Sequence, residues 1–267
     1  MRMLSFVGPS GPAFGRLEDD LVVTMGRGLL AYLSGEPAME GPVLPLGAVQ
    51  LRAPILRPGK VICIGLNYRD HARESGQPLP EEPVLFAKFA NSVVGSGEAI
   101  LIPAATEKVD YEAELCAVMG RRTYQVTVDE ALTYVAGYTC ANDVSARDLQ
   151  FRTGQWTRGK TVDTFLPVGP WLVTPDEVGD PQDLDMRCLV NGQVMQESNT
   201  RQMVFGVAQL VSFISQTLTL EPGDLIATGT PSGVGYARKP PVYLHPGDTV
   251  TVEIERIGAL VNPVRAR

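Results

Sequence analysis

The chain has few of the residues that build thiolate or histidine metal sites: four cysteines and two histidines among 267 residues. No two cysteines form a Cys-x-x-Cys pair, and each lies inside an apolar, strand-like segment. We therefore predict buried, reduced thiols rather than disulfides or a zinc site. The four are Cys63, Cys116, Cys140 and Cys188.

Long apolar runs and runs of like charge are also absent. No stretch of about 18 apolar residues occurs, and glycine and proline interrupt the apolar start MRMLSFVGPSGPAFG, where a signal peptide needs a continuous apolar region. The 23 basic and 30 acidic residues give a formal net charge of −7, with no clustering of either sign. We therefore expect a cytoplasmic protein with no nucleic-acid partner and no membrane partner.

Short apolar segments bounded by turn residues dominate the chain and predict many short strands. Asn191-Gly192, between two alternating segments, is typical of a two-residue hairpin, because both turn positions tolerate a positive φ. The predicted strands include VICIGL after Lys60, VLFAKF after Pro83, ILIP after Ala99, AELCAVMG after Glu112, WLVT after Pro170, RCLVNGQVMQ after Met186, LIATG after Asp224 and TVTVEIERIG after Asp248.

Only two convincing helices accompany these strands. One begins at Thr127, which can form a capping box with Glu130, and continues through an apolar stripe that reaches Ala136. The other covers about 203–217, with apolar residues at helical spacing. This excess of strands predicts an α+β fold with a mixed or antiparallel sheet rather than alternating βα units. Residues 1–55 carry their own strands and a Gly/Pro-rich end, so we expect a small N-terminal β subdomain followed by a larger domain at 56–267.

Two glutamates stand two residues apart in the strand-like segment DYEAELCAVMG. The two-residue period of a strand directs Glu112 and Glu114 to the same side. A solvent-facing strand edge would explain such a pair taken alone. Asp143, just after the apolar run that precedes it, could instead complete a three-oxygen face, although a turn residue is the simpler reading of Asp143 by itself. Oxygen ligands of this kind favour Mg²⁺ or Mn²⁺, with Ca²⁺ as an alternative.

A histidine and a glutamate form a second candidate pair in GLNYRDHARE. His71 and Glu74 are three residues apart, so a single helical turn places them on one face. Glu74 could orient the imidazole while its other nitrogen acts as a general base towards water. An exposed short helix with ordinary surface charges explains the same sequence segment equally well. The surrounding segment, about 67–82, is rich in charge, Gly and Pro, and we expect it to be a mobile lid.

The segment GQWTRGKT at 154–161 fits the phosphate-binding pattern G-x-x-x-x-G-K-[ST]. We reject a nucleotide site, because that motif must connect a buried strand to a helix and polar residues precede it here. Lys160 remains a candidate fixed cation for a substrate carboxylate or enolate oxygen. The loop 228–235, which contains Thr230, offers small residues and backbone amides that could approach an oxyanion.

These segments together resemble the fumarylacetoacetate hydrolase family. GLNYRDHARE, PVLFAKF, DYEAELCAVMG, GYTCANDVSARDLQ, GQWTRGKTVDTFLPVGPW, VNGQVMQ and DLIATGTPSGVG follow in that family's order, from about residue 58 to the C-terminus. The order and sequence of these motifs are closest to those of the small single-domain branch, which includes acylpyruvases, oxaloacetate decarboxylases and hydroxymuconate-type isomerases. The resemblance implies a mixed β-roll and a homodimer, a divalent ion at the three carboxylates and a lid bearing the His–Glu pair. It also implies pocket roles for Arg147, Gln150, Lys160 and Thr230.

The resemblance constrains the mechanism more than the substrate. The favoured function is metal-dependent cleavage, by C–C hydrolysis or decarboxylation, of a small β-carbonyl 2-oxo acid such as an acylpyruvate or oxaloacetate through a metal-bound enolate. The alternative is an isomerase or hydratase of a 2-hydroxy-diene dioate, such as a 2-hydroxyhepta-2,4-diene-1,7-dioate isomerase. A third possibility is a binding protein that is stabilised by a metal ion and has no catalytic activity. We disfavour it because every predicted acid, base and metal-ligand position is occupied by a suitable residue.

Overall fold

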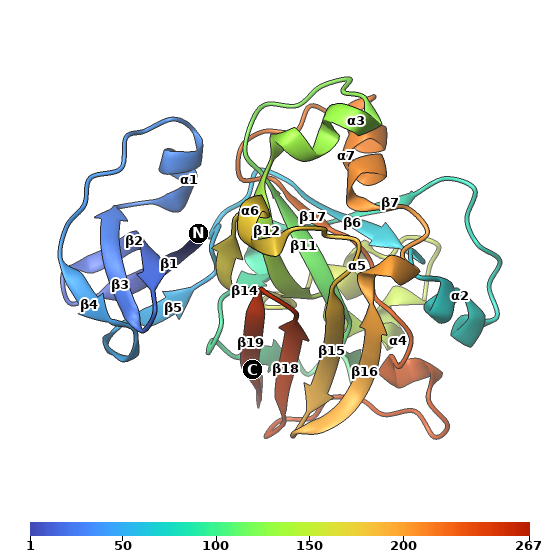
Figure 1. Ribbon diagram of the computed structural model, residues 1–267. Coiled ribbons are helices and arrows are strands. Elements are labelled where there is room, and N and C mark those ends of the chain that lie inside the picture. Colours follow the sequence, from blue (N-terminus) through green and yellow to red (C-terminus); the bar gives the residue numbers. More distant parts are fainter.

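The computed structural model describes residues 1–267 and is built around a mixed, twelve-stranded sheet (Figure 1). The strand order is β4-β3-β2-β1-β14-β12-β11-β17-β6-β7, with β5 paired to β1 and β8 paired to β14. Most pairs are antiparallel, whereas β17–β6 and β14–β8 are parallel. The strands are β1 Arg2–Gly8, β2 Gly11–Glu18, β3 Leu21–Gly26, β4 Val43–Pro45, β5 Gln50–Arg52, β6 Val61–Gly65, β7 Val84–Lys88, β8 Val93–Val94, β11 Ala113–Met119, β12 Val135–Asn142, β14 Leu166–Val173 and β17 Leu225–Ala227.

A second, five-stranded sheet, β16-β15-β18-β19-β9, packs near the middle of the first, and a small pair β10–β13 lies beside the site. The largest apolar core has contributions from both sheets and includes Leu115, Cys188, Val252 and Ile214. The two layers thus bury the strands β11 and β12 that carry the acidic residues. The bounds are β9 Ile100–Ile102, β10 Val109–Asp110, β13 Ser145–Ala146, β15 Asp185–Val190, β16 Gln193–Asn199, β18 Thr249–Ile254 and β19 Gly258–Ala266.

Seven short α-helices cover the ends of the sheets, and none is long and apolar enough to cross a membrane. In Figure 1, α3 and α7 lie together at one end of β11 and β12, and α2 lies beside the far end of the central sheet. The helices are α1 Leu29–Leu33, α2 Arg69–Ser75, α3 Val128–Ala131, α4 Arg147–Gln150, α5 Thr157–Lys160, α6 Pro175–Val178 and α7 Val207–Ser215.

The N-terminal strands β1–β5 and α1 form a β subdomain at one side of the molecule (Figure 1). Its sheet is continuous with the central sheet, because β1 pairs with β14 through Arg2↔Val173 and Met3↔Leu172. The expected small N-terminal β subdomain and the mixed α+β fold are confirmed, while the exact boundary after residue 55 stays a prediction.

Several local predictions are also confirmed. Asn191 and Gly192 have φ values of 52° and 78° and connect β15 to β16, as the hairpin pattern requires. All four cysteines are free and buried. The capping box of Thr127 and Glu130 is present. Residues 154–161 follow the helix α4 and a turn rather than a strand, consistent with the rejection of a nucleotide loop.

The helix that begins after Thr127 is shorter than its apolar stripe predicts. It ends at Ala131 and a 3₁₀ turn, Leu132–Tyr134, follows, so the prediction of a helix through Ala136 is wrong. Val135 instead begins β12, whose antiparallel pairing with β11 runs from Val135↔Met119 to Asn142↔Ala113. Long-range strand pairing therefore overrides the local helical periodicity. The second helix is confirmed over its central residues, Val207–Ser215.

Candidate metal centre and cavity

Three buried carboxylates meet at one point of the central sheet. One carboxylate oxygen from each of Glu112, Glu114 and Asp143 lies within 4.8 Å of the others. Their relative exposures are 6%, 1% and 0%, which excludes the solvent-facing strand edge as an explanation. The arrangement is therefore a compact acidic triad inside the protein.

Strand register produces this convergence. The pairing of β11 with β12 sets Ala113 opposite Asn142, so the residues just outside the ladder, Glu112 and Asp143, are neighbours. Their backbones are joined by a hydrogen bond from Asp143 N to Glu112 O at 2.9 Å, and Asn142 Oδ1 accepts from Glu112 N at 2.9 Å. Glu114 follows two residues later on the same side of β11.

Buried cations surround two of the three carboxylates. Lys160 Nζ donates to Glu112 Oε2 and to Asp143 Oδ2, both at 2.7 Å. Arg147 Nη2 donates to the other oxygen of Glu112 at 2.5 Å, and Lys88 Nζ donates to the other oxygen of Asp143 at 2.6 Å. Burial alone would raise the pKa of Glu112, but the charges of Arg147 and Lys160 hold that pKa well below its ordinary value.

Glu114 is the exception, because no cation contacts its side chain. Its carboxylate accepts one hydrogen bond, from Gly229 N at 2.8 Å. Burial raises the pKa of Glu114 well above its usual range, and the negative charges of Asp143 and Glu112 raise it further. The cluster as a whole contains four buried acids against three buried cations: Asp110, Glu112, Glu114 and Asp143 against Lys88, Arg147 and Lys160. The uncompensated negative charge is concentrated on Glu114.

A hard divalent cation fits this donor set. Three converging carboxylate oxygens are the ligands that Mg²⁺ and Mn²⁺ prefer, and the ion would supply the positive charge that Glu114 lacks. The sequence-predicted ligands are thus brought together in the structure, with no histidine or cysteine among them.

The loop that follows β17 binds carboxylates of the protein itself. Its backbone amides donate to three different acids: Gly229 N to Glu114, Gly233 N to Glu74, and Gly235 N and Tyr236 N to Asp110. Its predicted use as an oxyanion-binding loop is therefore wrong for these amides, because their hydrogens are already donated. Gly233 has a φ of 101°, and a Cβ there would lie 2.3 Å from Met195 O, so this close approach requires glycine.

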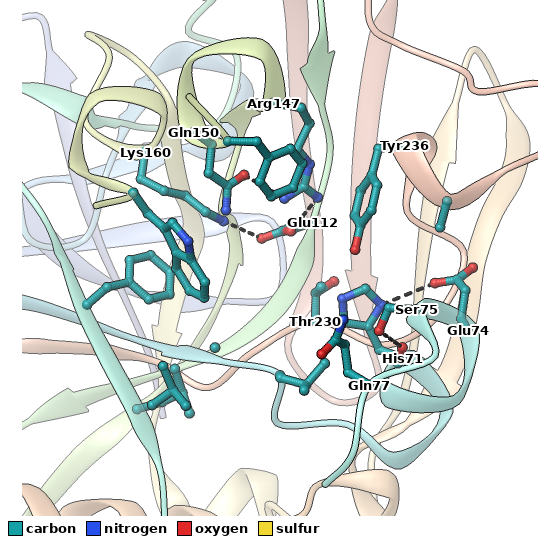
Figure 2. A pocket seen from close by; sticks show the side chains of 18 of the residues that line it. His71, Glu74, Ser75, Gln77, Glu112, Arg147, Gln150, Lys160, Thr230 and Tyr236 are labelled. Atoms are coloured by element: carbon teal, nitrogen blue, oxygen red, sulfur yellow. Dashed lines mark hydrogen bonds and ion pairs between the residues drawn. The ribbon is translucent and has the colours of Figure 1, made fainter. Parts of the chain in front are cut away.

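The predicted His–Glu pair lies on α2 and is formed. His71 Nδ1 lies 3.1 Å from Glu74 Oε2, and the second carboxylate oxygen of Glu74 accepts from Gly233 N at 2.9 Å. Figure 2 shows His71 between the helix and Thr230, with the ring of Tyr236 on the side of Arg147. The His71 and Tyr236 rings meet edge to face, with centroids 6.5 Å apart. Since Nδ1 is engaged by Glu74, Nε2 is the nitrogen available for proton transfer.

A cavity of about 690 Å³ connects the triad to this pair. Its polar lining includes eight of the nine sequence-predicted site residues: His71, Glu74, Glu112, Glu114, Arg147, Gln150, Lys160 and Thr230. Asp143 lies behind them. Beside Lys160, Phe86 and Trp156 meet edge to face with centroids 5.3 Å apart, and Lys160 Nζ lies 5.0 Å from the centre of the Phe86 ring. The cavity is therefore polar at the carboxylates and aromatic beside Lys160.

The predicted pocket residues are placed as follows. Gln150 Oε1 accepts from Arg147 Nη1 at 2.9 Å, and both residues lie on α4. Arg147 also donates to Asp110 Oδ2 at 2.9 Å and stacks 4.4 Å from the centre of the Tyr236 ring. Thr230 donates to Ala113 O at 2.9 Å, which leaves its side chain beside the first residue of β11.

Sequence reasoning missed three residues that shape this site. Lys88 lies at the end of β7 and neutralises Asp143. Asp110 holds Arg147 and accepts three backbone amides. Gln196 Nε2 donates to Thr230 Oγ1 at 2.8 Å while its oxygen accepts from Ala113 N at 2.9 Å. Asp110 adjoins the predicted acids and could have been suspected, whereas nothing local distinguishes Lys88 or Gln196.

Comparison with known proteins agrees with the fold. The profile "Fumarylacetoacetate (FAA) hydrolase C-terminal" matches residues 60–265, and "Rv2993c-like, N-terminal" matches residues 1–54. A 2-hydroxyhepta-2,4-diene-1,7-dioate isomerase from Mycobacterium marinum is 41% identical with a TM-score of 0.87, covering 100% of this chain and 99% of that one. A fumarylacetoacetate hydrolase from Exiguobacterium antarcticum is 39% identical with a TM-score of 0.91 and full coverage of both chains. The chain belongs to the fumarylacetoacetate hydrolase family and is an enzyme of that family.

Within the family, the chain falls in the branch that combines the Rv2993c-like N-terminal part with FAHD2-type sequences. The mitochondrial oxaloacetate tautomerase FAHD2A of Bos taurus is 50% identical over 241 residues, which cover 90% of this chain and 77% of the bovine protein. The human protein of that name is 48% identical over the same length and coverage.

Proposed function

We propose that this enzyme interconverts the enol and keto forms of a small 2-oxo dicarboxylic acid, with oxaloacetate as the first substrate to test. The observation that carries the proposal is one cavity in which the His71–Glu74 pair faces the acidic triad of Glu112, Glu114 and Asp143. The names of the bovine and human relatives support the choice of reaction.

A bound Mg²⁺ or Mn²⁺ ion would neutralise the triad and polarise the 2-oxo acid group. The chain's own residues do the rest. Arg147, Lys160 and Gln150 form the polar wall and bind the anionic end of the substrate, and Thr230 also lines the cavity. Because Lys160 and Arg147 are held by carboxylates on rigid elements, they present fixed rather than mobile charge.

Proton transfer falls to His71. Its Nε2 takes the proton from the enol hydroxyl and returns a proton to C3, so that the enol becomes the keto acid with no atom gained or lost. Glu74 fixes the ring through Nδ1 and stabilises the imidazolium that forms between the two transfers. In the reverse direction the same nitrogen removes a proton from C3.

Cleavage of a β-carbonyl 2-oxo acid is the second candidate. The His71–Glu74 distance of 3.1 Å suits a pair that activates water, which simple tautomerisation does not require. The sequence motifs alone favour cleavage, whereas the named relatives favour tautomerisation or isomerisation. Tautomerisation moves a proton at the carbon next to the 2-oxo group, and cleavage breaks a carbon–carbon bond at that carbon. The same residues can therefore serve either reaction.

A substrate panel with Mg²⁺ or Mn²⁺ separates the candidates. Freshly dissolved enol-oxaloacetate is followed by the decay of its ultraviolet absorbance, with pyruvate measured in the same sample. We expect faster decay than in buffer with the metal alone and no pyruvate beyond that background. Stoichiometric pyruvate, or release of pyruvate from an acylpyruvate, would replace tautomerisation by cleavage. Turnover of a 2-hydroxy-diene dioate with oxaloacetate unaffected would replace the substrate, and inertness towards all three would refute the proposal.

A further inference from the structure

A second cavity lies away from the catalytic site, between the N-terminal subdomain and the segment that leads into the rest of the chain. Its volume is about 470 Å³, within the usual range for small-molecule sites. Residues of β1, β2, the start of α1 and the linker that follows β5 line it. The floor is apolar and firmly packed, since Phe6, Leu29 and Ile55 are almost fully buried.

The charged residues of this cavity are all of one sign. Arg27, Arg52 and Arg57 line it and no aspartate or glutamate does, although the chain contains 30 acidic residues against 23 basic ones. Arg52 is held in place by Glu98, with Nη1 3.1 Å from Oε1. The exposed side chains of Arg27 and Arg57 form no ion pair. The cavity thus has one anchored guanidinium and two that are free to bind a ligand.

Arg27 and Arg57 differ from the surface arginines that have a carboxylate partner within the protein. Several surface arginines contact a carboxylate of the protein. Examples are Arg16 with Glu18 and Glu40, Arg187 with Glu253, Arg201 with Asp183 and Arg267 with Asp163. At the second cavity two of the three positive charges, those of Arg27 and Arg57, have no internal compensation, so an external anion is the complementary partner.

We propose that this cavity binds an organic anion that joins a carboxylate or phosphate group to an apolar body. The planar guanidinium groups of Arg27 and Arg57 pair with the oxyanion, which their two-pronged donor geometry matches. The apolar body lies against the exposed side chains of Leu30 and Leu56, which also line the cavity, and removes their surface from water. A free inorganic anion would fill only the rim of a cavity of this size.

The site is built across a structural junction. Leu30 of α1 packs on the turn at Gly223, whose Cβ position would lie 2.3 Å from Leu30 Cδ1. The linker that carries Arg57 leads directly into β6, whose last residue, Gly65, lines the catalytic cavity. A ligand held by both the subdomain and the linker stabilises their packing together. Binding therefore raises the unfolding temperature of the whole chain.

Calorimetric titration of the full chain tests this with four probes of equal chain length: octanoate, octyl phosphate, octanol and octylamine. The test protein is Arg27→Gln/Arg57→Gln, and the control is Arg122→Gln/Arg265→Gln, which removes the same charge from two exposed positions outside the cavity. The titrations contain no other small carboxylate, because such an anion would compete for the guanidiniums of Arg27 and Arg57. Circular dichroism verifies that both variants fold.

We expect octanoate or octyl phosphate, and neither octanol nor octylamine, to bind the parent chain and raise its unfolding temperature. Loss of the two guanidiniums should weaken that binding by at least about tenfold, and the control should bind like the parent. The tighter of the two anions identifies the head group. Binding of neither anion, equal binding of octanol, or unchanged binding by the Arg27/Arg57 variant would each overturn the proposal, and none of these results bears on the catalytic cavity.

Discussion

The ammonium group of Lys160 bridges two of the three triad carboxylates, 2.7 Å from an oxygen of Glu112 and 2.7 Å from an oxygen of Asp143. Both contacts are buried, and removing one partner of a buried ion pair costs about 3–5 kcal/mol because the remaining charge loses its compensation. Lys160 and a divalent ion therefore stabilise the same negative charge. Their effects on stability should not be additive.

Replacing Lys160 with Met should destabilise the metal-free chain by about 3–5 kcal/mol, and Mn²⁺ should recover more stability in the variant than in the parent. Denaturant unfolding with EDTA and with excess Mn²⁺ measures both effects. Lys239→Met, at an exposed residue with no ion pair, serves as the control and should change neither value by more than about 0.5 kcal/mol. Equal stabilisation by Mn²⁺ in the Lys160 variant and the parent would show that the ion does not sit at this triad.

Glu114→Gln should separate the metal from the fold. The amide oxygen can still accept the hydrogen bond from Gly229 N, so the fold keeps its contact, while the ligand charge is lost. We expect Mn²⁺ affinity to fall by at least about tenfold with no loss of stability in EDTA. Isothermal titration measures the affinity, and Glu107→Gln on the surface is the matched control. An unchanged affinity would remove Glu114 from the ligand set.

The acidic triad could be predicted from sequence because it depends on short-range rules. The two-residue period of a strand places Glu112 and Glu114 together, and the end of the next strand supplies Asp143. Lys88 could not be found in the same way. Lys88 and Asp143 are 55 residues apart in the sequence. Lys88 ends a strand whose sequence does not indicate which strands lie beside it in the sheet. Only the long-range strand order brings that ammonium group to the carboxylate.

The fold shows the same division between local and long-range information. The Asn191-Gly192 hairpin and the capping box at Thr127 are local, and both are confirmed. The helix expected through Ala136 gives way to β12, because pairing with β11 satisfies its backbone groups over eight residues of buried strand. The arginine-lined cavity is likewise invisible in sequence, since Arg27 and Arg57 are joined only by the packing of the linker against β1 and α1.

Substitution of His71 tests proton transfer independently of the metal. Loss of the general base in His71→Ala should reduce turnover of enol-oxaloacetate by roughly 10²- to 10⁴-fold. Mn²⁺ affinity should remain that of the parent, because His71 contacts Glu74 rather than the triad. Stopped-flow absorbance and titration provide the two values. A parallel loss of metal affinity would mean that the substitution disturbs the whole site, and Gln77→Ala, on the same wall, controls for general disturbance of the cavity.

Gly65 controls the aromatic wall of the cavity. A Cβ at this position would lie 2.9 Å from the Trp156 ring, which is too close, so Gly65→Ala should displace the ring. We expect kcat/KM for a long 2-hydroxy-diene dioate to fall about tenfold relative to that for oxaloacetate, because the longer substrate needs more of the space beside Trp156. Gly154→Ala, in the loop before α5 and with nothing within 4 Å, is the control. An equal effect on both substrates would mean that neither reaches Trp156, or that both do.

The segment expected to be a lid divides into two unequal parts. Asn67 and Tyr68 are fully buried, and Asn67 exchanges hydrogen bonds with Phe205 and donates to Thr228 O, so the chain that enters α2 is anchored. The stretch 76–82 is exposed at almost every position. The expectation of mobility from residue 67 onwards therefore narrows to the C-terminal end of α2 and the residues that follow it.

Hydrogen exchange should distinguish the anchored part of this segment from the exposed part. The effect of an inhibitor on that exchange distinguishes cleavage by activated water from tautomerisation. The contact of Glu74 with Gly233 N is the one that closes the end of α2 over the cavity, and a 2-oxo acid mimic such as oxalate should stabilise it. We expect amides of 74–82 to exchange fast without ligand and to be protected by oxalate with Mn²⁺, while those of 67–71 are slow in both states. Glu74→Gln weakens this contact and should reduce the protection without releasing the metal. If oxalate binds and 74–82 exchange unchanged, α2 does not close on the ligand, and the water-activating role of His71 and Glu74 loses its support relative to tautomerisation.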